Sequence, residues 1–318
     1  MQRMETTNLQ FFRTDISPYQ APNFKELEIN RLSKLSITPA NKLTDADILI
    51  TNTHTRFELL TADSIKNVKL IIHPNSGYDN IPSSFVRGYN FPIIVGNPVR
   101  AAGVTEYILS CVFKHYCQIL ERKSWDSSRS WKRQRLADQN VLVIGRGLIG
   151  NKLIECLSPL VNSLSCYDPF KGLEELVPEN KNIVLIAASL NQTSHHLVNK
   201  ELLSRLPKDS VIVNAARGKI INQEDLKDYL RENKSAHAYL DVFENEPFKV
   251  NEFSEFENLH CSSHIAGVSN NLDQLILDFE YKVLNDFLTH RSSVDKFLDT
   301  YSSLSLKNKL SPDKSFLI

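Results

Sequence analysis

The chain has 318 residues, which is enough for two domains that each bury a hydrophobic core. Its 37 Lys and Arg residues balance 37 Asp and Glu residues, so no overall positive field attracts nucleic acid or a membrane surface, and we expect a small-molecule partner. Five cysteines, mostly inside apolar segments and without C-x-x-C spacing, predict buried, reduced thiols. An N-terminus without leader character predicts a soluble, cytoplasmic protein.

Short apolar runs alternate with more polar stretches in the first hundred residues. The runs at 47–51, 68–73 and 92–95 predict strands, and the stretch at 57–65 predicts a helix between them. This alternation is typical of a small parallel sheet.

A turn rich in small and polar residues follows the strand that ends at His73. Open α/β sheets usually place ligands at the carboxyl ends of their strands. The backbone amides of Ser76 and Gly77 are therefore candidates to hold an anion. An ordinary loop closed by Asp79 and Asn80 explains the same residues equally well.

The central segment predicts a connector followed by a basic loop. Asn97-Pro98 interrupts the strand and helix alternation, and residues 103–120 then predict a long, mostly apolar helix between two lobes. Residues 125–135 are basic and contain two tryptophans. They are either a nucleic-acid patch or a solvated or dimer-facing loop, and the short, isolated basic run favours the loop.

The stretch from Val141 to Asp168 predicts a strand, a glycine turn, a helix and a second strand. Gly145, Gly147 and Gly150 have G-x-G-x-x-G spacing, which suits a tight turn, close approach of a pyrophosphate and close packing of helix on strand. A carboxylate at residue 168 would bind ribose hydroxyls and repel a 2′-phosphate, which favours NAD over NADP. The alternative is an ordinary β-α-β crossover without a ligand, in which Asp168 only caps the secondary-structure element that follows it.

The same alternation continues after the glycine turn. Strands are expected at 183–187, 211–215 and 236–241, helices at 197–206 and 223–232, and an amphipathic helix at 271–290. The polar tail, residues 302–318, predicts a poorly ordered end.

Arg217, Glu246 and His264 follow at strand ends or in loops. An arginine pairs with a substrate carboxylate, an imidazolium gives its proton to a carbonyl oxygen as hydride arrives, and a carboxylate keeps that imidazolium protonated. Together they suit hydride transfer to a keto acid. Each residue also has a simpler explanation. Arg217 could form a surface ion pair, Glu246 could be a turn residue before Pro247, and His264 could be a core histidine with satisfied hydrogen bonds.

Four segments resemble, in the same order, segments of the D-isomer-specific 2-hydroxyacid dehydrogenases. They are VLVIGRGLIG, VIVNAARGKIINQEDL, AYLDVFENEP and SSHIAG. The resemblance extends from about Leu49 to about Leu288. It implies a two-lobed α/β fold, with a Rossmann-type doubly wound parallel sheet and a smaller flavodoxin-like α/β substrate domain. We expect the substrate domain at residues 1–98 and 285–318, and the NAD-binding domain at 99–284.

The resemblance also implies individual roles. Arg217 matches the substrate-binding arginine, His264 the catalytic acid/base and Glu246 its paired acid, while Ser76 and Gly77 match the loop that holds the substrate carboxylate. The implied cofactor-binding residues are Gly145, Arg146, Gly147, Leu148, Ile149, Gly150, Asp168, Ala215, Asp241 and His264. No metal is implied, because His195 and His196 lack a third ligand and read as surface or cofactor-edge residues.

The chain departs from the family pattern in two places. Ser189 and Asn191 replace the usual proline and threonine, and the segment at 97–106 is shorter than usual, which leaves the substrate open. We expect an NAD-dependent dehydrogenase acting on a small 2-keto or D-2-hydroxy acid, as a homodimer. The alternatives are a family member acting on another small anion, such as formate or phosphite, and a non-catalytic NAD(H)-binding regulatory protein.

Overall fold

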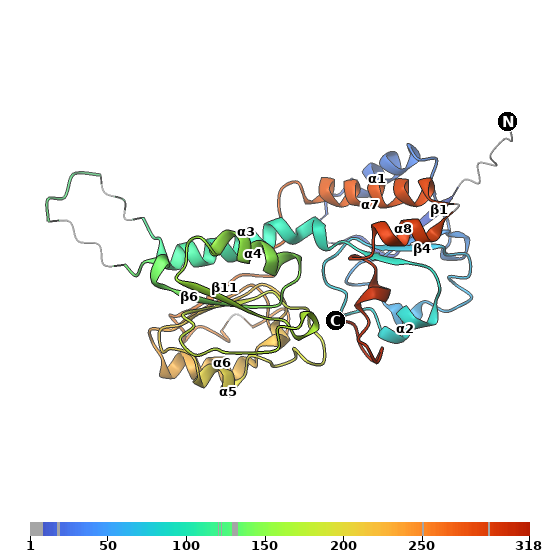
Figure 1. The fold of residues 1–318 in the computed structure, drawn as a ribbon. Coiled ribbons are helices and arrows are strands. Elements are labelled where there is room, and N and C mark those ends of the chain that lie inside the picture. Colours follow the sequence, from blue (N-terminus) through green and yellow to red (C-terminus); the bar gives the residue numbers. More distant parts are fainter. Residues whose placement is uncertain are drawn as a thin grey trace. The chain divides into compact units, whose positions relative to one another are not determined.

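The chain forms two compact units. The computed structural model describes residues 9–17, 20–119, 121, 123–128, 133–249, 251–291 and 293–318. Unit 1 comprises Met1–Arg100 and Val268–Ile318, and unit 2 comprises Ala101–Gly267. Each unit has its own parallel sheet (Figure 1). The expected domain limits at 98 and 284, and the roles assigned to the two domains, remain predictions.

Unit 1 is built on a five-stranded parallel sheet with the order β2-β1-β3-β4-β5. Its strands are β1 (Gln10–Arg13), β2 (Thr38–Pro39), β3 (Ile48–Ile50), β4 (Leu70–His73) and β5 (Ile93–Val95). One face is covered by α1 (Phe24–Ser33), α7 (Leu272–Thr289) and α8 (Val294–Thr300), and the other by α2 (Ser83–Gly88) (Figure 1). Because both faces are covered, all three residues of β3 are buried.

Two expectations for unit 1 are wrong. Residues 57–65 form only a 3₁₀ turn, Phe57–Leu59, which ends where Leu60 takes an extended conformation with φ −83° and ψ 90°. The tail is ordered: Leu317 is buried in the core, and the hydroxyl of Tyr78 donates to the carbonyl of Ile318 at 2.5 Å. A few apolar side chains are enough to anchor that segment.

Unit 2 is a doubly wound, six-stranded parallel sheet with the order β11-β10-β9-β8-β6-β7. Its strands are β6 (Asn140–Ile144), β7 (Ser163–Tyr167), β8 (Ile183–Ile186), β9 (Val211–Asn214), β10 (His237–Leu240) and β11 (Leu259–Cys261). Helices α3 (Asn97–Tyr116) and α4 (Leu148–Leu157) cover one face, and α5 (Lys200–Ser204) and α6 (Gln223–Glu232) the other (Figure 1). Alternate residues of each central strand pack on opposite faces.

Helix α3 begins six residues before the expected start at Gly103, at Asn97. Pro98 lies in its first turn, where a missing N–H breaks no helical hydrogen bond. Residues 129–132 lie outside the described residues, so the interpretation of the basic segment at 125–135 stays a prediction. Within the described ranges, no helix is both long and apolar enough to cross a bilayer.

Candidate active site

The glycine turn between β6 and α4 has the geometry that a dinucleotide site requires. Gly145 has φ +96°, and an added Cβ would lie 2.6 Å from the Cα of Ala188, so no other residue fits. A Cβ on Gly150 would lie 2.0 Å from the carbonyl oxygen of Gly145. Gly147 differs, because a Cβ there would meet no protein atom within 4 Å. The packing of the protein therefore does not require glycine at position 147. A pyrophosphate bound close to the backbone at the N-terminus of α4 would require it, because a side chain there would occupy the same space.

Asp168 follows β7 and braces this turn. Its Oδ2 accepts from the backbone N–H of Arg146 at 2.8 Å, and Lys171 donates to the carbonyl of the same residue. The carboxylate therefore lies at the glycine turn, as an acid that binds a ribose must. The residues present fit an adenine dinucleotide.

Replacing Asp168 by alanine is expected to reduce the preference for NADH over NADPH. A carboxylate facing a 2′-phosphate costs on the order of 1–3 kcal/mol, or about 5- to 150-fold in affinity. With the acid removed, Arg146 and Lys171 remain to attract the phosphate. Fluorescence titration with both nucleotides measures the change, and Glu174→Ala, an exposed acid in the same loop, is the control. If the unmutated protein binds NADH and NADPH with equal affinity, Asp168 does not select against the 2′-phosphate.

The arginine loop follows β9 and is fixed by Asn214. The buried amide of Asn214 accepts from the N–H of Ala216 at 3.0 Å and donates to the carbonyl of Arg217 at 2.9 Å. A Cβ on Gly218 would lie 1.9 Å from the carbonyl carbon of Phe243. Only glycine permits this approach, which brings the arginine loop against the segment that carries Glu246.

Glu246 and His264 form a direct pair. The Nδ1 of His264 lies 2.8 Å from Oε2 of Glu246, and the N–H of Phe243 donates to Oε1 at 2.9 Å. Burial pushes the pKa of Glu246 upward, but the hydrogen bonds from His264 and Phe243, with the positive charges of His264 and Arg217, outweigh burial and lower it. The pair is half-exposed, with 49% of the histidine and 36% of the glutamate side chain accessible.

Asp241 fixes the loop that carries His264. It follows β10, is 1% exposed, and its carboxylate accepts from the N–H groups of Ile265 and Ala266 at 2.9 and 2.8 Å. Its backbone carbonyl accepts from the N–H of His264 at 2.8 Å. The structure thus shows Asp241 as an anchor for the loop, and its expected role in cofactor binding remains a prediction.

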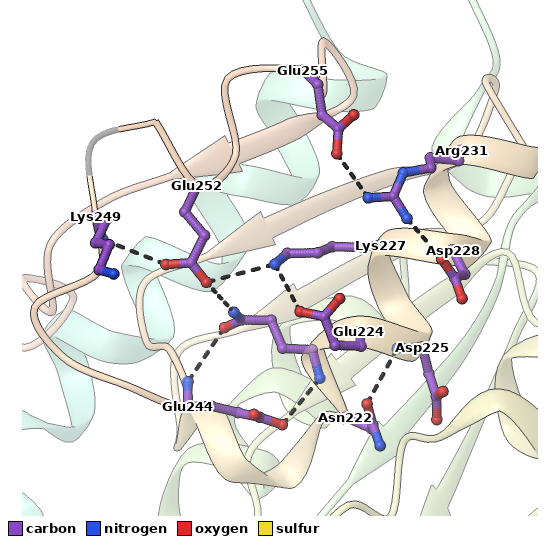
Figure 2. A network of polar contacts seen from close by, with 11 residues as sticks. Asn222, Glu224, Asp225, Lys227, Asp228, Arg231, Glu244, Lys249, Glu252 and Glu255 are labelled. Atoms are coloured by element: carbon purple, nitrogen blue, oxygen red, sulfur yellow. Dashed lines mark hydrogen bonds and ion pairs between the residues drawn. The ribbon is translucent and has the colours of Figure 1, made fainter.

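A polar network holds the segment before Glu246 against α6 (Figure 2). The backbone N–H of Gln223 donates to Oε1 of Glu244 at 3.0 Å, and its side-chain amide donates to Glu252 at 2.7 Å. Lys227 lies 3.6 Å from the same Glu252 carboxylate. These contacts hold the loop at residues 241–247, which carries Glu246 and is called the glutamate segment below, against α6.

One contact of this region was not expected from the sequence. His196, expected at the surface or the cofactor edge, has a side chain that is 35% exposed, and its Nε2 lies 2.8 Å from Oε1 of Glu244. The pair ties the loop after β8 to the glutamate segment. No local signal points to it, because 48 residues separate the partners. Among the described residues, no group of three His, Cys, Asp or Glu side chains is arranged to hold a metal ion.

Ser76 and Gly77 lie in unit 1, in the turn after β4. The buried imidazole of His73 accepts from the hydroxyl of Thr51 at Nδ1, 2.9 Å away, and donates from Nε2 to the carbonyl of Gly77 at 2.8 Å. The hydroxyl oxygen of Ser76 is buried without a hydrogen-bond partner within the described chain. An unsatisfied buried hydroxyl is costly, so it marks this turn as a candidate ligand contact.

The doubly wound sheet, the glycine turn and the carboxylate of Asp168 beside that turn are features of an NAD-binding dehydrogenase domain. Residues 108–266 match the model of the D-isomer specific 2-hydroxyacid dehydrogenase NAD binding domain. The chain belongs to the D-isomer specific 2-hydroxyacid dehydrogenase family. The expected family, α/β fold, oxidoreductase class and NAD cofactor are therefore confirmed.

Individual relatives differ in the substrates that their names state. Erythronate-4-phosphate dehydrogenase of Blochmanniella floridana is 29% identical over 85% of this chain and 68% of its own length. D-3-phosphoglycerate dehydrogenase of Methanocaldococcus jannaschii is 26% identical over 70% of this chain, which spans 46% of that relative. D-lactate dehydrogenase from Aquifex aeolicus, solved with NAD and lactic acid, superposes with a TM-score of 0.69 at 18% identity, covering 93% of this chain and 98% of that one.

Proposed function

We propose that the protein interconverts a small 2-keto acid and its D-2-hydroxy acid, with His264 as acid/base, Glu246 as its partner and Arg217 binding the substrate carboxylate. The observation that carries the proposal is the 2.8 Å contact between His264 and Glu246, in a loop anchored at the carboxyl edge of the sheet. Ligands of open α/β sheets bind at that edge. NAD, when bound, supplies or accepts the hydride.

The pairing assigns a role to each ring nitrogen. Because Nδ1 of His264 faces Glu246, Nε2 is the atom that exchanges a proton with the substrate oxygen. In reduction the imidazolium gives that proton to the carbonyl oxygen, and in oxidation the neutral ring takes it back. The ionised Glu246 favours the imidazolium and holds the ring in place. Ser76 and Gly77, in unit 1, are also proposed to bind the substrate carboxylate.

The named relatives support this substrate class. Erythronate-4-phosphate, 3-phosphoglycerate and lactate dehydrogenases all act, by their names, on acids with a hydroxyl group. A homodimer and a cytoplasmic location, both expected from the sequence, also remain proposals.

A panel of 2-keto acids assayed with NADH tests the proposal. We expect NADH oxidation with at least one small 2-keto acid and formation of the D-isomer, identified by chiral chromatography. Oxidation of formate or phosphite with NAD⁺ would instead support the other-anion alternative. NADH binding without turnover of any of these compounds would support a regulatory protein.

Arg217→Lys is expected to lower kcat/KM for the keto acid strongly while leaving NADH binding nearly unchanged. An ammonium cannot reproduce the planar, two-point contact of a guanidinium with a carboxylate. Steady-state kinetics and NADH titration separate the two effects. The control is Arg205→Lys, because Arg205 pairs with Glu179 on the surface at 2.6 Å. Full activity in Arg217→Lys would remove Arg217 from the proposed site.

A further inference from the structure

A chain of short hydrogen bonds connects α3 to the loop that carries His264. The hydroxyl of Ser262 lies 2.6 Å from Oδ1 of Asp241 and 2.6 Å from the hydroxyl of Tyr107. A carboxylate accepts hydrogen bonds and does not donate them, so Ser262 donates to Asp241 and accepts from Tyr107. Tyr107 is therefore the first donor of the chain.

The loop at the end of this chain is held in a strained conformation. His264 has φ +54°, in the left-handed region that residues other than glycine rarely adopt. Such conformations persist where surrounding contacts impose them. The contacts here are the backbone carbonyl and carboxylate of Asp241, which accept from three successive N–H groups, at His264, Ile265 and Ala266.

Helix α3 also packs directly on this loop. A Cβ on Gly103 would lie 3.3 Å from the carbonyl oxygen of Ala266, so the helix backbone is close to the loop backbone. Burial raises the pKa of Tyr107, an effect that its hydrogen bond with Ser262 partly opposes and that the charge of Asp241 reinforces. The hydroxyl thus remains a donor across the neutral pH range.

We propose that Tyr107 is a positioning residue, which acts through Ser262 and Asp241 to hold His264 against Glu246. This inference rests on the proposed function, because it assumes that the histidine–glutamate pair exchanges the substrate proton. Tyr107 lies on α3, and its hydroxyl contacts Ser262 rather than His264 or Glu246. Its effect is transmitted by the orientation of the His264 loop.

Tyr107→Phe tests the role, because it removes only the hydroxyl. We expect kcat for keto acid reduction to fall about tenfold, the equivalent of one well-formed hydrogen bond, with KM for NADH unchanged. The alkaline limb of the pH profile is expected to move to lower pH, because a loosened His264 is less well paired with Glu246. Tyr116→Phe is the matched control: Tyr116 is a buried tyrosine of the same helix whose hydroxyl has no partner among the described residues.

A second pair of variants separates positioning from general stability. Ser262→Ala interrupts the chain and is expected to lower kcat as Tyr107→Phe does, whereas Ser262→Thr keeps a hydroxyl and is expected to restore most of the activity. Thermal unfolding of all variants identifies any that lose activity through loss of fold. A Ser262→Thr variant that unfolds at the native temperature but does not regain activity would contradict the role of the Tyr107–Ser262–Asp241 hydrogen bonds.

A double-mutant cycle with Glu246→Ala gives the decisive measurement. If Tyr107 acts by aligning His264 with Glu246, its hydroxyl is expected to matter little once Glu246 is absent, so the two effects will not add. Fully additive effects, or a Tyr107→Phe enzyme that matches Tyr116→Phe, would overturn the inference. If Glu246→Ala and His264→Ala are themselves active, the proposed function fails instead.

Discussion

Replacing His264 by alanine is expected to lower kcat/KM for keto acid reduction by about a hundredfold to ten-thousandfold, the usual range for a lost general acid. The substitution removes the ring that lies 2.8 Å from Glu246. NADH is still expected to bind, because the glycine turn at Gly145–Gly150, to which His264 does not belong, is retained in the variant. An alanine variant that keeps activity would show that another group supplies the proton.

Glu246→Gln tests the same pair without removing the ring. Because the pKa of Glu246 is lowered from its ordinary value of 4.5, its carboxylate is ionised at pH values above 4.5 and stays ionised somewhat below that pH. The ion pair with His264 is lost only when the pH falls through the lowered pKa of Glu246. A glutamine keeps the size but not the charge, so the imidazolium of His264 loses its counterion. The alkaline limb of the reduction profile is therefore expected to move to lower pH. Superimposable profiles would show that the two residues are not coupled.

Arg13→Met is expected to destabilise the protein by about 3–5 kcal/mol, which is the cost of leaving buried charge without its partner. Arg13 of β1 contacts Glu28 of α1 at 2.5 Å and also pairs with Glu280 of α7. The two glutamates are 1% and 0% exposed. Urea unfolding measures the loss, and Arg13→Met combined with Glu28→Gln is expected to recover part of it, because Glu28 is the other buried carboxylate that Arg13 contacts.

The matched control lies on the same two helices. Arg31 of α1 pairs with Asp278 of α7 at 2.6 Å, but 33% and 46% of these side chains are exposed. Surface pairs contribute about 0–1 kcal/mol, so Asp278→Asn is expected to have little effect. Equal losses in Arg13→Met and Asp278→Asn would contradict the importance assigned to burial.

Glu280 also predicts a pH dependence of stability. Burial, opposed by Arg13 and reinforced by Glu28, raises the pKa of Glu280 from 4.5 to about 8. A raised carboxyl pKa means that the folded state holds the proton more tightly than the unfolded state does. The stability that protonated Glu280 contributes is therefore complete below pH 4.5 and is lost as the pH rises through about 8. The free energy of unfolding is expected to fall over that range, and Glu280→Gln to reduce the fall. An unchanged slope would show that Glu280 does not titrate there.

The sequence by itself determined the parts of this protein that depend on local pattern. Gly145, Gly147 and Gly150 act through spacing along one turn, so the nucleotide-binding motif and the NAD cofactor were predictable without a structure. The alternation of apolar runs predicted the doubly wound sheet, because strands buried on both faces must be continuously apolar. Residue type and order singled out Glu246 and His264 as a candidate pair.

Only the tertiary structure decided which distant groups meet. Tyr107 and Ser262 are 155 residues apart, and Arg13 and Glu280 are 267 apart, yet each pair is in hydrogen-bond contact. Such partners depend on strand order and on the faces that helices cover, which local propensities do not encode. The anchoring role of Asp241 likewise follows from a folded loop, in which strand β10 ends beside the backbone N–H groups that its buried carboxylate satisfies.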